Sequence, residues 1–152
     1  MKTNKYYTPD ISEFYVGFEY EAEDLWDNGI SRVWKHQVFE GEETRTYFIE
    51  ELQNNEMRVK YLDSDDIESL GFEFKYNEKN NENIAFTKKY DNHPRYDNQY
   101  VDIIWNHVSN HILICEGDNE TCWSDWVTRF SGKIKNKSEL KRTLKQIGYE
   151  GK

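Results

Sequence analysis

Short runs of aromatic and β-branched residues, separated by polar turn segments, constrain the fold of this chain more than any other feature. In the clearest run, Met57–Leu62, one face holds Met57, Val59 and Tyr61 and the other holds Arg58 and Lys60. Such alternation is typical of a half-buried antiparallel strand. Further strand candidates are Phe14–Tyr20, Val33–Phe39, Phe72–Tyr76, Ile84–Tyr90, Tyr100–Val108, Ile112–Glu116 and Cys122–Ile134. The short connections between these runs favour antiparallel pairing.

Two segments carry helix signals instead. Asp63 or Ser64 is placed to cap a helix of one or two turns that stops at Gly71. The last helix begins after Asn136, a preferred N-cap residue, and stops at Gly148. Its apolar stripe consists of Leu140, Leu144 and Ile147. This spacing predicts an amphipathic C-terminal helix with a basic outer side.

The sequence therefore predicts an α+β fold that is mainly β. We expect an antiparallel sheet of about seven or eight short strands, a short central helix and an amphipathic C-terminal helix. The segment Arg45–Leu52 fits a strand or a short helix equally well. A chain of 152 residues suits one domain, 1–152, with residues 1–9 flexible or bound along a surface. Because 16% of residues are aromatic and the mean hydropathy is −1.03, the core should be thin and rich in aromatic rings.

Charge is unevenly distributed along the chain. The net charge is −9, but the segment Lys133–Lys152 has seven basic and two acidic residues, a net +5, which leaves −14 on the remaining 132 residues. An acidic body repels phosphate and anionic membranes, so we expect no direct DNA binding and no membrane binding. It favours a basic partner, or serves solubility alone. No apolar signal-peptide core is visible, which makes the cytoplasm the expected compartment.

Three segments resemble a known group of proteins. They are Tyr6–Glu21 (YYTPDISEFYVGFEYE), Met57–Gly71 (MRVKYLDSDDIESLG) and Phe130–Gly148 (FSGKIKNKSELKRTLKQIG). Together they resemble uncharacterised small proteins encoded by bacteriophages and prophages, in which the intervening segments vary. The resemblance covers about fifty of the 152 residues. It implies a phage-associated origin and the host-cell cytoplasm as location, and it brings no activity or site residue with it.

Aromatic and basic residues near the C-terminal end suggest one binding surface. Trp123 and Trp126 precede the basic helix, whose outer side carries Lys137, Lys141 and Arg142. Aromatic rings and cations together are typical of surfaces that hold nucleotides or acidic partners. The simpler interpretation is an ordinary amphipathic helix with a solvated basic side.

The weak candidates for a metal site lie between two tryptophans. His107, His111, Cys115 and Cys122 are spaced H-x3-H-x3-C-x6-C, and all four are residue types that zinc accepts. The spacing matches no zinc-finger pattern, and the surrounding pattern predicts strands. We therefore expect packed cysteines and exposed histidines, with no metal or other cofactor.

Catalytic motifs are absent from the sequence. It contains no G-x-S-x-G nucleophile elbow, no phosphate-binding loop and no G-x-G-x-x-G motif. The leading hypothesis is a non-enzymatic phage accessory protein that binds a host or phage protein, with a host factor as the first candidate, through aromatic anchors. The alternatives are a protein that binds a small anionic ligand of the nucleotide type, a virion component, and a metal-dependent hydrolase. Oligomeric state is not indicated by the sequence.

Overall fold

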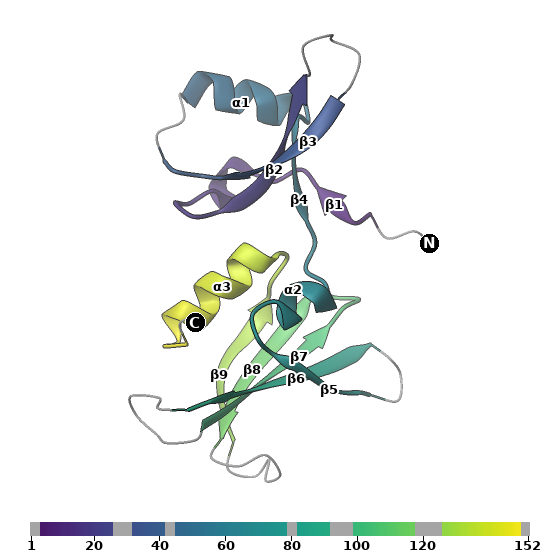
Figure 1. Cartoon of the computed structure of the whole chain (residues 1–152), viewed down its shortest axis with the longest axis vertical. Helices are drawn as coiled ribbons and strands as arrows, with labels where there is room; N and C mark the ends of the chain where they lie inside the picture. Colours follow the sequence, from purple (N-terminus) through teal and green to yellow (C-terminus); the bar gives the residue numbers. More distant parts are fainter. Residues whose placement is uncertain are drawn as a thin grey trace. The chain divides into compact units, whose positions relative to one another are not determined.

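The strands form two antiparallel sheets, and the fold is α+β and mainly β, as the sequence predicts. The computed structural model describes residues 4–25, 32–41, 45–78, 82–91, 99–117 and 126–149. These residues include nine strands, slightly more than expected. The chain divides into two compact units, Met1–Tyr61 and Leu62–Lys152, called here the N-terminal and C-terminal units (Figure 1). The expectation of a single domain stays a prediction.

The N-terminal unit contains a four-stranded sheet in the order β1-β4-β2-β3. A short 3-10 turn follows β1, and one helix connects β3 to β4 (Figure 1). This helix covers Arg45–Leu52, the segment for which the sequence predicted either a strand or a short helix. The bounds are β1 Tyr6–Tyr7, the 3-10 turn Ile11–Glu13, β2 Glu19–Leu25, β3 Arg32–Val38, α1 Arg45–Gln53 and β4 Met57–Lys60.

The core of this unit is largely aromatic, as the composition predicts. Phe48 of α1 packs against Met57 and Val59 of β4, and all three are buried. The ring of Phe14 meets that of Phe48 edge-on, with the ring centres 4.6 Å apart. Edge-on aromatic pairs contribute about 0.5–1.5 kcal/mol beyond the area they bury. Aromatic contacts therefore replace much of the aliphatic packing that the chain lacks.

The strand predicted at Phe14–Tyr20 is wrong over its first part, because β2 begins only at Glu19. Before it, the backbone turns at Gly17, whose φ of 94° lies in the left-handed region that favours glycine. Phe14 and Phe18 then join the same aromatic cluster. The aromatic run reflects packing into one cluster rather than strand alternation.

The C-terminal unit contains a five-stranded meander in the order β5-β6-β7-β8-β9. Every neighbouring pair is antiparallel, so each strand pairs with the next one in sequence. A short helix precedes the sheet and a longer one follows it (Figure 1). The bounds are α2 Ser64–Glu68, β5 Glu73–Asn77, β6 Asn83–Tyr90, β7 Gln99–Asn106, β8 His111–Gly117, β9 Val127–Lys133 and α3 Lys137–Gln146.

One face of this sheet holds the core of the C-terminal unit. Val101 and Ile103 of β7 pack with Ile114 of β8, and α3 covers them with Leu140 and Leu144. Because side chains alternate along a strand, the intervening residues of β7 and β8 lie on the opposite face of the sheet. That opposite face is called here the open face, since α3 does not cover it.

The ends of α3 confirm the sequence signals. The side chain of Asn136 accepts a hydrogen bond from the Glu139 amide at 2.9 Å. At the other end Gly148 has a φ of 98°, and the Tyr149 amide donates to the carbonyl of Leu144 at 2.8 Å. This is a Schellman termination, which satisfies carbonyls that the helix leaves open. Sequence alone therefore located both ends of this helix.

Candidate functional site

Arg58 organises the most distinctive side-chain cluster of the N-terminal unit. Its neighbours on β4, Met57 and Val59, point to α1, so Arg58 lies on the face of the sheet opposite α1, called here the outer face. Its guanidinium carbon lies 3.9 Å from the ring centre of Tyr6 and 4.2 Å from that of Trp34. The cation is therefore held between two aromatic rings, an arrangement that the ring quadrupoles stabilise.

A carboxylate completes this cluster. Nε of Arg58 donates a hydrogen bond to Oε2 of Glu21, and the two residues face each other in the β2–β4 register. The side chains are only 28% and 30% exposed, so the ion pair is partly removed from solvent. Charge-assisted hydrogen bonds are stronger than neutral ones in such surroundings. The four residues Tyr6, Glu21, Trp34 and Arg58 are called here the Arg58 stack.

Each strand of the sheet contributes one residue to the Arg58 stack. Tyr6 lies on β1, Arg58 on β4, Glu21 on β2 and Trp34 on β3. The stack therefore spans the sheet from edge to edge, and its geometry depends on the register of all four strands. Within the described residues of the N-terminal unit, the only α-helix, α1, lies on the other face of the sheet.

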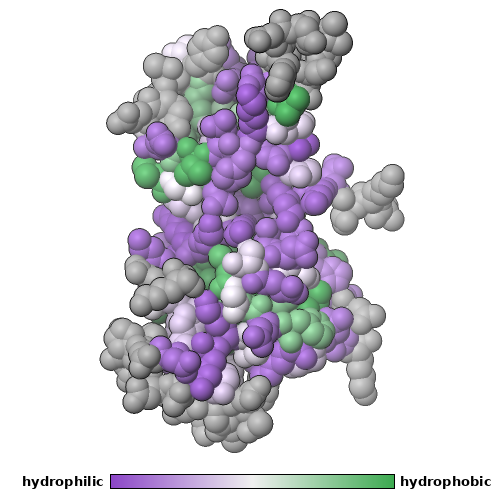
Figure 2. Space-filling view, viewed as in Figure 1, coloured by the Kyte–Doolittle hydropathy of each residue, from purple (hydrophilic) through white to green (hydrophobic). Residues whose placement is uncertain are grey.

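The surroundings of the Arg58 stack are acidic. Glu19, Glu21 and Glu23 alternate along β2 and share the outer face. The whole N-terminal unit has thirteen acidic and seven basic residues, a net charge of −6. Figure 2 shows mainly hydrophilic residues over the visible face of this unit, with small separate hydrophobic patches. Such a surface attracts cationic groups and repels anionic ones.

No family model, no curated protein and no solved structure matches the chain. Candidate functional residues therefore follow from the geometry of the chain itself.

The predicted binding residues do not come together. Trp126 packs over Gly117, and Nζ of Lys75 lies 5.4 Å from its ring centre. Gly117 is one residue from Glu116, a core-face position, which places Trp126 over the open face. Lys141 and Arg142 are exposed residues of α3, which covers the core face, and Lys137 at its start is half-buried. The sheet separates Trp126 from the helix, and Trp123 lies outside the described residues.

A buried ion pair occupies the open face. Oδ2 of Asp102 on β7 binds Nζ of Lys75 at 2.8 Å, and Asp102 is fully buried. Cys115 faces Asp102 across the β7–β8 register and is buried as well. Burial raises the pKa of the Cys115 thiol, and the nearby Asp102 charge adds to this, although a hydrogen bond with Thr128 opposes it. A thiol with a raised pKa is a weak nucleophile at neutral pH.

The weak metal candidates are spread along the β7–β8 hairpin. His107 is exposed in the turn, and its ring lies edge-on to Trp105. His111 is exposed at the start of β8, where its Nε2 lies 3.3 Å from the Ser131 hydroxyl. Cys115 is four strand residues further, roughly 13 Å along the chain. Within the described residues no three His, Cys, Asp or Glu side chains are placed to hold a metal, and Cys122 lies outside them.

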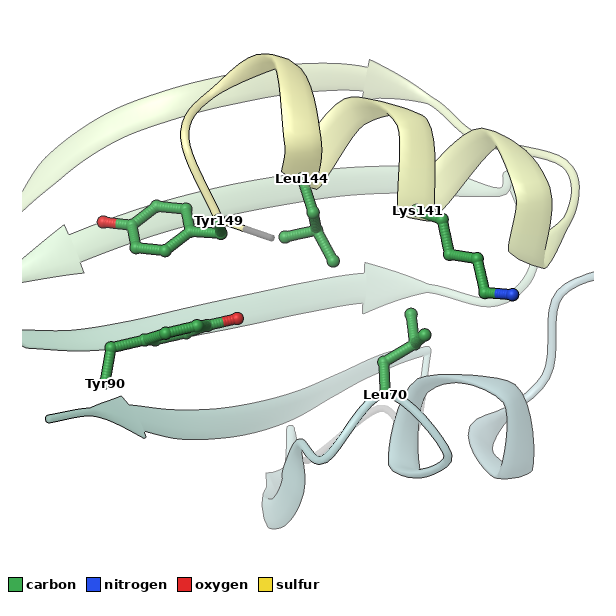
Figure 3. A pocket seen from close by; sticks show the side chains of 5 residues that line it. All are labelled: Leu70, Tyr90, Lys141, Leu144 and Tyr149. Atoms are coloured by element: carbon green, nitrogen blue, oxygen red, sulfur yellow. The ribbon is translucent and has the colours of Figure 1, made fainter. Parts of the chain in front are cut away.

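A small recess lies between α3, the end of β6 and the segment that follows α2 (Figure 3). Leu70 and Leu144 point toward each other across it, while the hydroxyls of Tyr90 and Tyr149 point in opposite directions. Tyr149 donates its hydroxyl to Glu116, which also pairs with Arg129. The cavity volume is about 40 Å³, enough for a few water molecules and far below the roughly 300 Å³ of ordinary ligand pockets.

Sequence reasoning missed the whole Arg58 stack. It placed Arg58 on the polar face of its strand but did not connect it to Tyr6 or Trp34. The alternation of β3 gave no usable signal, because Val33 and Lys35 on either side of Trp34 are exposed and the pattern marks neither face as buried. None of the described helices is long and apolar enough to cross a membrane.

Proposed function

We propose that this chain is a non-enzymatic interaction protein that binds a basic host protein through the outer face of its N-terminal sheet. The observation that carries the proposal is the Arg58 stack. Tyr, Trp and Arg are the residue types most enriched among interface hot spots. Here one of each is held in a fixed arrangement before any partner binds.

Preorganisation is what makes the stack suitable for binding. Arg58 is fixed by two rings and by Glu21, so little side-chain freedom remains to be lost on association. Ordering one flexible side chain at an interface costs about 0.5–1.5 kcal/mol, and a surface that is already ordered avoids this cost. The acidic side chains of β2 next to the stack favour a partner with positive charge.

A phage origin fits the same surface. Tyr6, Glu21 and Arg58 lie in the segments that resemble bacteriophage-encoded proteins, whereas Trp34 lies in a segment that varies within that group. In this proposal the protein acts in the cytoplasm of the infected cell. The other possibilities, namely a nucleotide-binding protein, a virion component and a metal-dependent hydrolase, stay predictions that no described feature favours.

Affinity capture with matched variants tests the proposal. The full chain is immobilised and exposed to bacterial lysate at low salt, and captured proteins are quantified by mass spectrometry. We expect a specific basic protein whose recovery falls as salt rises. Arg58→Ala and Trp34→Ala should each reduce its recovery more than about tenfold, which corresponds to loss of a hot spot.

Arg142→Ala is the matched control, since it removes an exposed arginine on α3. We expect it to capture the partner like the natural chain. If Arg142→Ala loses the captured partner and Arg58→Ala does not, the binding surface lies on α3 and not on the N-terminal sheet. Failure to capture any protein specifically at low salt would contradict the proposal.

A further inference from the structure

The four sheet edges of this protein differ in how well they resist pairing with another strand. An unprotected edge strand exposes backbone amides and carbonyls. Proteins usually protect such edges by keeping the edge strand short or by placing a bulge in it. At one edge of the N-terminal sheet β1 has only two residues, Tyr6–Tyr7. In the C-terminal sheet β5 has a register shift between Phe74 and Tyr76, and β9 has one opposite Ile114 and Cys115.

The remaining edge, β3, has none of these features. Its seven residues pair with β2 in one continuous register, from Arg32 opposite Leu25 to Val38 opposite Glu19. It contains no proline, glycine or bulge. Its two valines, Val33 and Val38, are 40% and 44% exposed. Its one described lysine, Lys35, is already paired with Asp24, so its charge is partly neutralised.

The backbone of β3 has a free side with a defined set of groups. Just beyond the strand, the Phe39 amide donates to the Phe18 carbonyl at 2.9 Å, so Phe39 is directed at β2. Backbone direction alternates along an antiparallel strand. The amides and carbonyls of Trp34, His36 and Val38 are therefore directed away from β2, and no other described strand lies on that side.

We propose that β3 accepts an extended, basic segment of the partner as an additional strand. This inference rests on the proposed function and specifies how the partner binds. Strand addition gives affinity through backbone hydrogen bonds and specificity through alternate side chains. Here Trp34, His36 and Val38 supply the backbone groups, and Trp34 continues the Arg58 stack toward the added strand.

Charge determines the choice of occupant. Neighbouring strands lie about 4.8 Å apart, so an added strand is roughly 10 Å from β2. That distance is comparable to the Debye length at physiological salt, so the net charge of −6 on the N-terminal unit attracts lysines and arginines on the added strand. A second copy of this chain fits less well. Two units of net charge −6 repel each other, and centred antiparallel pairing of β3 places Lys35 opposite its own copy.

Hydrogen exchange with a synthetic peptide tests the inference on the full chain. The probe is a nine-residue peptide of alternating lysine and valine, and the comparison peptide has glutamate in place of lysine. We expect the lysine peptide to bind and to slow amide exchange at Trp34, His36 and Val38 by roughly tenfold or more. The glutamate peptide should bind more than about tenfold less tightly.

Two variants of one position separate backbone pairing from side-chain contact. His36→Pro removes an amide that the fold does not use, and we expect it to weaken peptide binding more than about tenfold. His36→Ala removes the side chain but keeps the amide, and should bind like the natural chain. Unchanged thermal unfolding of both variants shows that the sheet is intact.

Three results would overturn strand addition. In the first, the lysine peptide binds but leaves the three amides exchanging as before, and His36→Pro binds normally. In the second, neither peptide binds. In the third, exchange at these amides slows with protein concentration alone, which makes a second copy the occupant. None of them removes the proposed function, because the capture experiment with Arg58→Ala tests that separately.

Discussion

Asp102 lies fully buried on β7, with one carboxylate oxygen bound to Lys75 and the other without a hydrogen-bond partner within the described residues. Desolvating a charge is costly, and the partner cation offsets much of this cost. Removal of the cation alone leaves the carboxylate buried and unpaired. The ion pair is therefore a position where a single substitution has a large effect.

We predict that Lys75→Met lowers the free energy of unfolding by about 3 kcal/mol, measured by urea denaturation. The double variant Lys75→Met with Asp102→Asn should recover a large part of this loss, because no unpaired charge remains. Additive effects of the two substitutions would show that the pair contributes nothing as a pair.

Tyr90 makes stability depend on pH in the alkaline range. Burial raises its pKa from 10.0 to about 12 in the folded protein. Between these values the unfolded chain loses the proton while the folded chain keeps it, so the free energy of unfolding falls as pH rises from 10 to 12. Tyr90→Phe should remove part of this decline. An identical decline in both proteins would assign it to other tyrosines, such as Tyr149, whose pKa is also raised by burial.

Single residues that act locally were predictable from sequence, and those that act across strands were not. Asn136 and Gly148 work within a few residues of their own helix, so spacing revealed them. The side chain of Asp63 likewise accepts from the Asp66 amide, which confirms the predicted start of α2. Asp102 and Lys75 meet across β6, and nothing in the local pattern of either strand indicates the other.

At the level of elements, the end of α3 gives a prediction with an unusually simple cause. Gly148 has a left-handed φ of 98°, and a Cβ added there meets no atom within 4 Å. Gly148→Ala should therefore destabilise the protein by about 1 kcal/mol through backbone strain alone, measured by thermal unfolding. Gly148→Asn should cost less, since asparagine tolerates this region. Equal losses would indicate a steric cause instead.

Elements with strict alternation were predicted best. The strand predicted at Met57–Leu62 is β4, which ends two residues earlier at Lys60 and has the expected faces, because one side meets an apolar cluster and the other is partly exposed. Arg45–Leu52 was undecided because it lacks a clear apolar stripe; of its described residues, only Phe48 is fully buried. The start of β2 was missed because Gly17 and the aromatic cluster, rather than strand propensity, determine the path of that segment.

For the whole molecule, the two hydrophobic clusters share no residue. One is built from residues of the N-terminal unit and the other from residues of the C-terminal unit. Phe48→Ala should cost about 3–5 kcal/mol locally, because it removes the central ring of the first cluster. We expect faster amide exchange in β2 and β4 and unchanged exchange in β7 and β8. Equal acceleration in both sheets would show that the chain unfolds as a single domain.

The Arg58 stack shows why the candidate site was not predictable from sequence. Its residues come from four strands, and their meeting depends on the order β1-β4-β2-β3, in which sequence neighbours are not always spatial neighbours. Composition correctly indicated excess aromatic residues. It could not show that Tyr6 and Trp34, separated by 27 intervening residues, lie on opposite sides of one arginine.

The burial of Cys115 has a kinetic consequence. A thiol reacts with alkylating reagents as the thiolate and only where the reagent reaches it, and this thiol is covered and has a raised pKa. The rate of Cys115 alkylation, identified by peptide mapping, therefore reports how often motions of the protein uncover the open face at β8. The natural chain thus contains a built-in probe of local opening on this face of the sheet, with no label added.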